Sequence, residues 1–173
     1  MAPLVARFAA LAGLVLSGYA LYVEHEMASA AAVGEEYEAL CDFKEGPLAG
    51  ASCSAVFDSG AGRLLSYFGL VERGSLFDVS NAAAGCGYYG AVLLHQPLAR
   101  ALGASASALL LVLGTSGALF SVYLAYLLAV VLKDFCVVCA GMHACNVAIF
   151  CAAIASAFAA SRSARSTTKA KKL

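Results

Sequence analysis

Apolar residues along this chain of 173 residues gather into four long runs, and polar segments separate them. A helix that crosses the hydrocarbon core of a bilayer needs about 20 consecutive apolar residues. We therefore predict four membrane spans, at about residues 8–23, 82–101, 104–132 and 135–160. The predicted fold class is an all-α integral membrane protein, a four-transmembrane-helix bundle that forms a single membrane domain over residues 1–173.

Three of these runs have features of their own. The first is slightly short, and "ASA" at 28–30 follows it, so a cleavable signal peptide is an alternative to the membrane anchor that we favour. Pro97 is expected to end or kink the second helix, because proline breaks the hydrogen-bond ladder. The third run exceeds the thickness of a bilayer, which predicts that it tilts or projects.

The one sizeable polar region lies between the first two spans, at about residues 24–81. It carries glycine and proline in "EGPLAGAS" and "DSGAGR", which is typical of loops. Within it, "RLLSYFGLV" at 63–71 is amphipathic and predicts a short helix lying over the mouth of the bundle. An ordinary loop helix packed on its neighbours is the alternative. We expect a lumenal loop with a cap segment.

Composition agrees with a membrane protein. The chain is 62% hydrophobic and 13% charged, whereas a soluble domain carries about 25% charged residues. The formal net charge is +0, so its meaning depends on where the charges lie. Nothing in the chain indicates nucleic-acid binding.

The charges divide between the two sides of the predicted bundle. All eleven acidic residues lie in the long loop or at the turn before the fourth span: Glu24, Glu26, Glu35, Glu36, Glu38, Asp42, Glu45, Asp58, Glu72, Asp78 and Asp134. Seven of the eleven basic residues lie on the other side: Arg7, Arg100, Arg162, Arg165, Lys169, Lys171 and Lys172. Because lysine and arginine favour the cytosolic side, both termini are predicted to be cytosolic. The long loop then faces the oxidising lumen or exterior, where disulfides persist.

The basic tail, residues 161–173, ends in "KAKKL". Lysines three and five places from the end resemble a retrieval signal for the endoplasmic reticulum, and a basic tail touching anionic lipid is the alternative. We predict a multi-pass protein of the endoplasmic reticulum membrane.

Cys136 and Cys139 form a CxxC at the head of the fourth span, in "LKDFCVVCAGMHACN". Residues three apart on a helix share a face, so the two sulfurs could pair or stand together as thiols. The N-terminus of a helix stabilises a thiolate, which creates a nucleophile where lumen and lipid meet. The alternatives are a structural zinc half-site, which no second CxxC or histidine pair completes, and a passive disulfide.

A second pair, Cys41 and Cys53, lies in the loop. Together the two pairs predict a relay: a soluble dithiol exchanges with the loop pair, which exchanges with the CxxC. The electron acceptor or donor in the bilayer is then a lipid-soluble quinone. The alternative is that a disulfide between Cys41 and Cys53 only cross-links the loop and takes no part in electron transfer. Cys86, Cys145 and Cys151 fall inside spans, where cysteine behaves as a small hydrophobe.

Polar groups near the spans supply candidate substrate contacts. His143 lies four residues after Cys139, on the same helical face, and could donate a hydrogen bond or a proton to a quinone or epoxide oxygen. Packing is the alternative for this histidine. Asn81 heads the second span, where it either caps the helix or donates its amide to a substrate carbonyl. Phe57, Tyr88 and Leu128 could line an apolar pocket.

Taken together, the motifs resemble the vitamin K epoxide reductase family. The matching segments keep their order along the chain: the loop pair with its neighbours (Cys41, Asp42, Ser52, Cys53, Ser54, Val56, Phe57), "FGLV" at 68–71, "SN…GC" (Ser80, Asn81, Gly85, Cys86), "SVYLAY" at 121–126 and "DFCVVC" at 134–139. The resemblance covers about residues 14–146 and implies the same four-span plan.

The resemblance also implies roles for the cysteines. Cys139 resembles the cysteine that attacks the quinone or epoxide, and Cys136 resembles its resolving partner, which receives electrons from Cys53. Cys41 resembles the cysteine first met by the reducing partner, a thioredoxin-like lumenal protein. Asn81 resembles the asparagine that hydrogen-bonds a substrate carbonyl.

The family also implies a pocket aromatic at Phe57, but several positions depart from its animal members. His143 stands where they have a tyrosine that contacts the second carbonyl, and Ala84 replaces a pocket phenylalanine. The segment "KEGPLAGA" lengthens the loop between Cys41 and Cys53, and the chain has no tryptophan.

The function predicted from these features is a membrane thiol–disulfide oxidoreductase that reduces vitamin K 2,3-epoxide and vitamin K quinone. We expect no tightly bound cofactor and no metal, with vitamin K or another quinone as substrate. The alternatives are a quinone-linked oxidase of protein thiols, which runs similar chemistry toward disulfide formation, and a non-catalytic membrane scaffold with structural disulfides.

Overall fold

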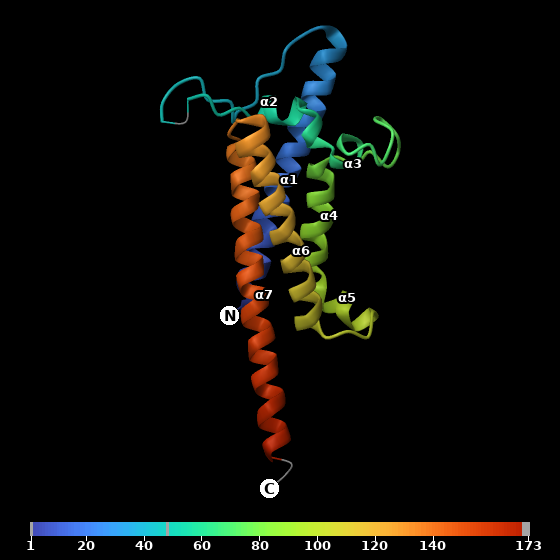
Figure 1. The fold of residues 1–173 in the computed structure, drawn as a ribbon, viewed down its shortest axis with the longest axis vertical. Coiled ribbons are helices and arrows are strands. Elements are labelled where there is room, and N and C mark those ends of the chain that lie inside the picture. The colour runs from blue at the N-terminus through green and yellow to red at the C-terminus, as the bar shows by residue number, and fades with distance from the viewer. Residues whose placement is uncertain (1, 48, 171–173) are drawn as a thin grey trace.

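The structure, a computed structural model, describes residues 2–47 and 49–170, although the side chains of 164–170 lie outside the description. Over these residues the chain forms helices and loops without a strand, which confirms the predicted all-α class. Four helices lie side by side (Figure 1). They are α1 (Ala2–Val33), α4 (Asn81–Leu93), α6 (Ala106–Tyr126) and α7 (Val137–Ala170).

Three helical stretches of the described chain are long and apolar enough to cross a membrane: Ala2–Val33, Ala106–Leu132 and Val137–Ser163. The second predicted span differs, because it is divided into α4 and the short helix α5 (His95–Ala101). At about 1.5 Å per residue, the 13 residues of α4 cover roughly 20 Å, less than the hydrocarbon core of about 30 Å.

The break between α4 and α5 follows from Pro97. A proline ring clashes with the carbonyl of the residue four positions earlier, and that residue here is Leu93, where α4 ends. Leu94 leaves helical geometry, and α5 starts with His95, so Pro97 lies in the first turn, where a missing N–H is tolerated. The kink expected from the sequence is therefore present, three residues before the proline itself.

α1 is longer than the run of residues 8–23 that predicted it. The stretch after Val23 is rich in alanine and contains neither glycine nor proline before Gly34, so the helix continues to Val33. Gly34 has a φ of +77°, and the N–H of Glu35 donates to the carbonyl of Ala30, a glycine-type helix end. The polar loop thus begins at Gly34 rather than at residue 24.

α6 continues into a π-helical segment, η2 (Leu127–Leu132), which together with α6 forms one long apolar stretch. Lys133 then takes a left-handed conformation, with a φ of +54°, and the N–H of Asp134 donates to the carbonyl of Leu128. This tight turn reverses the chain directly into α7, so that the CxxC lies at the end of the bundle.

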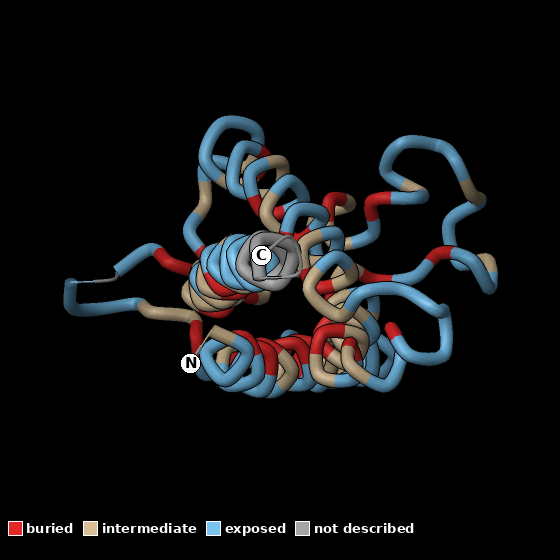
Figure 2. Tube along the Cα trace, turned by 90° about the horizontal axis from the view of Figure 1, so that it is seen from below, coloured by how far each residue is buried: buried red, intermediate tan, exposed pale blue. Residues whose placement is uncertain are grey.

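Small residues bring the helices together. The buried residues of α1 recur at steps of three or four: Ala6, Ala10, Gly13, Ser17, Ala20 and Val23. Such a stripe lets helix backbones approach closely, which drives packing in a membrane, where lipid offers as apolar a surface as leucine. A Cβ added to Gly13 would overlap the ring of Tyr89 on α4. Seen along the bundle, the buried positions face the neighbouring helices (Figure 2).

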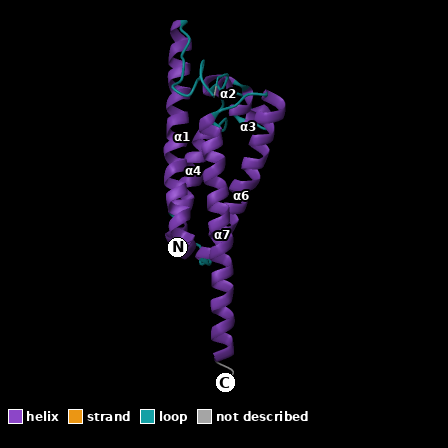
Figure 3. Ribbon diagram, turned by 90° about the vertical axis from the view of Figure 1, so that its left-hand side faces the viewer, coloured by secondary structure: helices purple, strands orange, loops and turns teal. Residues whose placement is uncertain are grey.

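Short helices and loops cover one end of the bundle (Figure 3). They are α2 (Cys53–Asp58), the 3-10 turn η1 (Gly60–Gly62) and α3 (Leu64–Tyr67), and we call residues 34–80 the cap. The amphipathic piece predicted at 63–71 is helical over Leu64–Tyr67 only. Gly69, with a φ of +67°, ends it there.

The two ends of the bundle differ in charge. The cap, the end of α1 and the start of α7 lie at one end, whereas the start of α1, α5 and the end of α7 lie at the other (Figure 1). The acidic residues belong to the cap end, and Arg7 at the opposite end donates to the Gln96 side chain at 3.1 Å. The "KAKKL" motif lies outside the residues whose side chains are described.

Candidate active site

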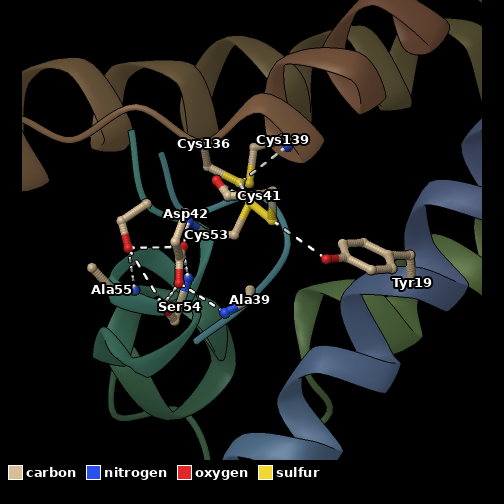
Figure 4. The surroundings of a disulfide bond; sticks show 10 residues. Tyr19, Ala39, Cys41, Asp42, Cys53, Ser54, Ala55, Cys136 and Cys139 are labelled. Atoms are coloured by element: carbon tan, nitrogen blue, oxygen red, sulfur yellow. Dashed lines mark hydrogen bonds between the residues drawn. A yellow bond between two sulfur atoms is a disulfide. The ribbon is translucent and has the colours of Figure 1, made fainter. Parts of the chain in front are cut away.

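Asp42 holds the loop that carries Cys41 and Cys53. Its carboxylate accepts hydrogen bonds from the N–H of Ala39 at 2.9 Å and from the N–H of Cys53 at 2.6 Å. The hydroxyl of Ser52 donates to it at 3.0 Å, and both the N–H and the hydroxyl of Ser54 donate as well. One partly buried carboxylate therefore fastens both ends of the loop beside its two cysteines (Figure 4).

The loop cysteines form a disulfide that lies against the CxxC. Cys41 and Cys53 are bonded to each other, while Cys136 and Cys139 are free thiols. The Cys136 Sγ lies 3.5 Å from the Cys53 Sγ (Figure 4). Cys53 and Cys136 have 0% exposure, and Cys41 has 8%. Two sulfurs in contact are placed for thiol–disulfide exchange, and Cys41 is the more accessible end of the loop pair.

A backbone hydrogen bond sets this contact. The N–H of Ser52 donates to the carbonyl of Phe135 at 3.0 Å, so the residues next to Cys53 and Cys136 are tied together. The lengthened part of the loop turns through Gly46 and Gly50, and the bond from the Phe43 N–H to the Ala51 carbonyl, at 2.8 Å, closes it. The extra residues thus lie outside the cysteine contact.

Cys136 takes the position of a helix cap, before the first residue of α7. The N–H of Cys139 donates to the Cys136 Sγ at 3.3 Å, and the N–H of Ala140 donates to the Cys136 carbonyl at 2.9 Å. The sequence predicted that both cysteines lie in the first turn and that its N–H groups favour a thiolate nucleophile. The structure differs, because Cys136 precedes α7 and the N–H that donates to a sulfur, that of Cys139, donates to Cys136.

Cys139 lines a partly open cavity of about 340 Å³ between α1, the cap, α4, α6 with η2, and α7. Val56, Phe57, Leu124, Leu127, Leu128 and Leu132 supply much of its apolar wall. Cys136 and the loop disulfide are not among the lining residues. The CxxC therefore connects two environments, with the loop disulfide on one side and an apolar cavity on the other.

Polar atoms interrupt the cavity wall on α4 and α7. The Tyr88 hydroxyl, both ring nitrogens of His143 and the Asn146 Oδ1 are buried and have no hydrogen-bond partner among the described residues. The Asn146 amide nitrogen donates to the Ser121 hydroxyl on α6 at 2.7 Å, which orients the amide. Buried polar groups without partners are costly, so these atoms are suited to contact a polar ligand.

Asn81 lies at the cap end of the cavity but does not cap its helix. Ser80 does so, since its hydroxyl accepts from the N–H of Ala83 at 3.2 Å. The Asn81 amide nitrogen donates to the carbonyl of Ala61 at 2.7 Å, and its oxygen accepts from the N–H of Leu64 at 3.4 Å. One amide N–H remains for a ligand, and the other contacts fasten the cap onto α4.

The structure thus divides the predicted site residues into two groups. Cys41, Cys53 and Cys136 are in contact with one another, whereas Phe57, Asn81, Cys139 and His143 share the cavity wall. The sequence reasoning missed Glu24 and Asn146, both of which line the cavity. The spacing of residues 139, 143 and 146 on one helical face was a usable signal for Asn146.

Comparison with known proteins agrees with this arrangement. The model of the Vitamin K epoxide reductase family matches residues 4–154. The chain is 43% identical over 143 residues to the Vitamin K epoxide reductase complex subunit 1 of Mus musculus, covering 80% of each chain. It is 42% identical over 140 residues to the subunit of the same name from Rattus norvegicus, covering 79% of this chain and 78% of the relative.

The chain belongs to the vitamin K epoxide reductase family. This confirms the resemblance drawn from the motifs and, with it, the predicted class of enzyme, a membrane oxidoreductase of the vitamin K epoxide reductase kind. The match includes α1, the cap, α4, α6 and the part of α7 that lines the cavity. Both cysteine pairs and the cavity therefore lie within the segment shared with the family.

The sulfurs of Cys41 and Cys53 and the carboxylate of Asp42 also lie within 4.8 Å of one another, a spacing found in metal sites. Here the two sulfurs are bonded to each other, and the carboxylate accepts hydrogen bonds from the loop. A metal needs thiolates as ligands, so the oxidised pair of this family member does not offer such a site.

Partial burial raises the pKa of Asp42, but hydrogen bonds from Ser54, Ala39 and Ser52 outweigh that effect and hold the pKa below its usual range. A lowered pKa stabilises the folded cap above the unfolded-state pKa, and this contribution is lost as the pH falls through the folded-state value. We expect Asp42→Ala to destabilise the cap by about 2 kcal/mol, because the N–H and hydroxyl groups of the loop lose their acceptor.

Thermal unfolding in detergent, followed across acidic pH, measures this effect. Glu45→Ala, at an exposed position of the same loop, is the matched control and should unfold like the wild type. The interpretation of Asp42 is wrong if the two variants have the same melting temperature.

Proposed function

We propose that this chain reduces vitamin K 2,3-epoxide and vitamin K quinone, with electrons that pass from the loop pair through the CxxC. The names of the two relatives include the reduction of vitamin K epoxide, the first of these reactions. The observation that carries the proposal is the position of the CxxC. Cys136 contacts the loop disulfide at 3.5 Å, and Cys139 faces the apolar cavity.

In the substrate half-reaction, the Cys139 Sγ attacks the ring, and the Cys136 Sγ then attacks the Cys139 Sγ. The sulfur–carbon bond breaks and a Cys136–Cys139 disulfide forms, so the two thiols lose two electrons and two protons. A quinone takes these up and becomes a hydroquinone. An epoxide takes them up and becomes the quinone, and its oxygen leaves as water.

A second half-reaction reduces the Cys136–Cys139 disulfide again. The Cys53 thiolate attacks the Cys136 Sγ, and the Cys41 thiolate then attacks Cys53 and resolves the mixed disulfide. The products are two thiols at the CxxC and a Cys41–Cys53 disulfide, which is the redox state in the structure. A thioredoxin-like lumenal dithiol protein then reduces the loop pair, and Cys41 is its point of entry because Cys53 is fully buried.

The membrane arrangement belongs to the same proposal. We place the protein in the endoplasmic reticulum membrane as a multi-pass protein with both termini in the cytosol. The acidic cap end and the basic opposite end support this orientation. In this proposal α4 contributes the fourth crossing, since it packs against α1 and α6, whereas α5 projects to the side of the bundle (Figure 1).

An assay of the purified protein in detergent tests the proposal. A dithiol is the electron donor, and vitamin K epoxide and vitamin K quinone are offered in parallel. Reduction of both is expected. If neither is reduced, the proposal is wrong. In that case, oxidation of a reduced protein by added quinone would instead identify the thiol oxidase that the sequence left open.

His143→Phe is expected to raise the KM for the quinone by up to about tenfold, because one neutral hydrogen bond to the ring is lost while the apolar shape is kept. The rate of exchange between Cys53 and Cys136 should not change, since His143 lines the cavity and not the loop disulfide. Steady-state kinetics and rapid thiol trapping separate the two effects. His25→Phe, at an exposed position on α1, is the control. An unchanged KM would make His143 a packing residue.

A further inference from the structure

Glu24 on α1 lines the cavity but has no role in the reaction proposed above. It lines the apolar cavity together with Asn81 and Cys139. It also lines an open, polar groove on the cap side of the bundle. Four residues border both spaces: Glu24, Phe57, Ser59 and Gly62. Glu24 is the one of these four whose side chain is ionisable.

The Glu24 carboxyl lies close to Asn81, the residue predicted to bind a carbonyl of the substrate. It lies within hydrogen-bonding reach of the Ser80 hydroxyl. The Ser80 oxygen accepts from the N–H of Ala83, so its hydrogen is free to be donated to Glu24. Ser80 precedes Asn81, whose remaining amide N–H is available to a ring oxygen. The Glu24 carboxyl thus lies next to Ser80, the chain neighbour of Asn81, and the side chains of Glu24 and Asn81 both line the cavity.

Several charged groups face Glu24 across the groove. Arg63 on the cap attracts it, and this arginine also contacts the Asp78 carboxylate at 3.8 Å. The other titratable or charged groups on the groove are Glu35, Glu36, Tyr37, Asp58, Arg73 and Asp78. On the cavity side, the titratable groups are Tyr88, Tyr89, Cys139 and His143. Glu24 is therefore the one carboxyl among the described residues that line the cavity.

We propose that Glu24 is the general acid that protonates the ring oxygen held at Asn81, and that the polar groove supplies its proton. This inference rests on the proposed function and adds a catalytic residue to it. In the apolar cavity an unprotonated oxygen anion is strongly disfavoured, so an acid at that oxygen lowers the barrier.

The protons and electrons of this step balance. As the Cys139 Sγ bonds the ring carbon, the electron pair moves to the ring oxygen, which takes the proton of the Glu24 carboxyl. Cys136 and Cys139 then form their disulfide and complete the transfer of two electrons. The sulfur–carbon bond breaks as this disulfide forms, and its electron pair goes to the second ring oxygen, which takes one of the two thiol protons. The other thiol proton is released to the groove water, and that water returns one proton to Glu24.

Glu24→Gln keeps the size and hydrogen bonding of the side chain but removes its acid. We expect kcat for quinone reduction to fall about 10²-fold, the lower end of what a general acid contributes. In the wild type, kcat should fall as the pH rises through the pKa of the acid, and the variant should lose this dependence. Glu24→Asp should recover part of the rate, because it restores the acid.

Two controls separate catalysis from folding. Glu26→Gln lies on the same helix, outside the lining of the cavity, and should retain wild-type kinetics. Maleimide trapping of Glu24→Gln should show the Cys41–Cys53 disulfide and two free CxxC thiols, as in the wild type. If Glu24→Gln keeps the wild-type kcat and pH profile, or changes KM alone, the inference is overturned while quinone reduction by the wild type still supports the proposed function.

Discussion

Cys139→Ala is expected to abolish reduction of both vitamin K quinone and its epoxide, with a loss of at least about 10³-fold in kcat/KM. Cys139 is the only cysteine among the described residues that lines the cavity, so no other thiol there can attack the ring. The loss should be the same with a protein donor and with a small dithiol, because Cys139 acts after both. Turnover of each substrate by purified protein in detergent measures it.

The matched control is Cys151→Ala, which changes an exposed cysteine on the same helix. It should retain full activity. Cys139→Ala should still form the Cys41–Cys53 disulfide, since Asp42 and the bond from Ser52 to Phe135 hold the loop independently of Cys139. A Cys139→Ala protein that still reduces quinone would contradict the proposed function and favour a structural role for the CxxC.

Cys53→Ala is expected to block reduction driven by a thioredoxin-like protein by at least about 10²-fold. Activity with a small membrane-permeant dithiol should be spared. The reason is the contact of 3.5 Å between the Cys53 and Cys136 sulfurs, combined with the complete burial of Cys136. A protein donor cannot reach Cys136 itself, whereas a small dithiol can enter the bundle. Parallel assays with the two donors measure the difference.

Cys41→Ala serves as the companion variant. It leaves Cys53 next to Cys136 but removes the thiol that resolves their mixed disulfide, so a Cys53–Cys136 disulfide should accumulate. Mass spectrometry of the linked peptides detects it. Equal loss of activity with both donors in Cys53→Ala, together with no such peptide in Cys41→Ala, would argue against the relay.

The sequence predicts the long helices of this protein well, but it predicts the residues at which they end less accurately. Long apolar runs predict α1, α6 and α7, because burial in lipid requires continuous helices. The end of α1 at Val33 was missed, since the alanine-rich stretch after Val23 carries acidic residues that suggest a loop. The break before Pro97 was expected, but the resulting shortness of α4 was not.

The candidate site, too, could be predicted from the sequence only in part. Pairs of cysteines at the loop and at the head of a span indicate disulfide exchange by residue type and spacing alone. The sequence could not show that Cys136 takes the cap position of α7 while Cys139 turns to the cavity, because this depends on the turn at Lys133. Glu24 carries no local motif, and its place at the cavity follows from the packing of α1 against the cap.

The sequence by itself determined the class of the protein, its three long apolar helices, its family and the presence of two cysteine pairs. These properties depend on apolar length, charge and residue type, which are local. Tertiary structure alone decided which sulfur touches which, that Asp42 fastens the loop, and which polar groups share a cavity with Cys139. The contact between the Cys53 and Cys136 sulfurs alone joins residues 83 positions apart, and only the packing of the helices and the cap brings such residues together.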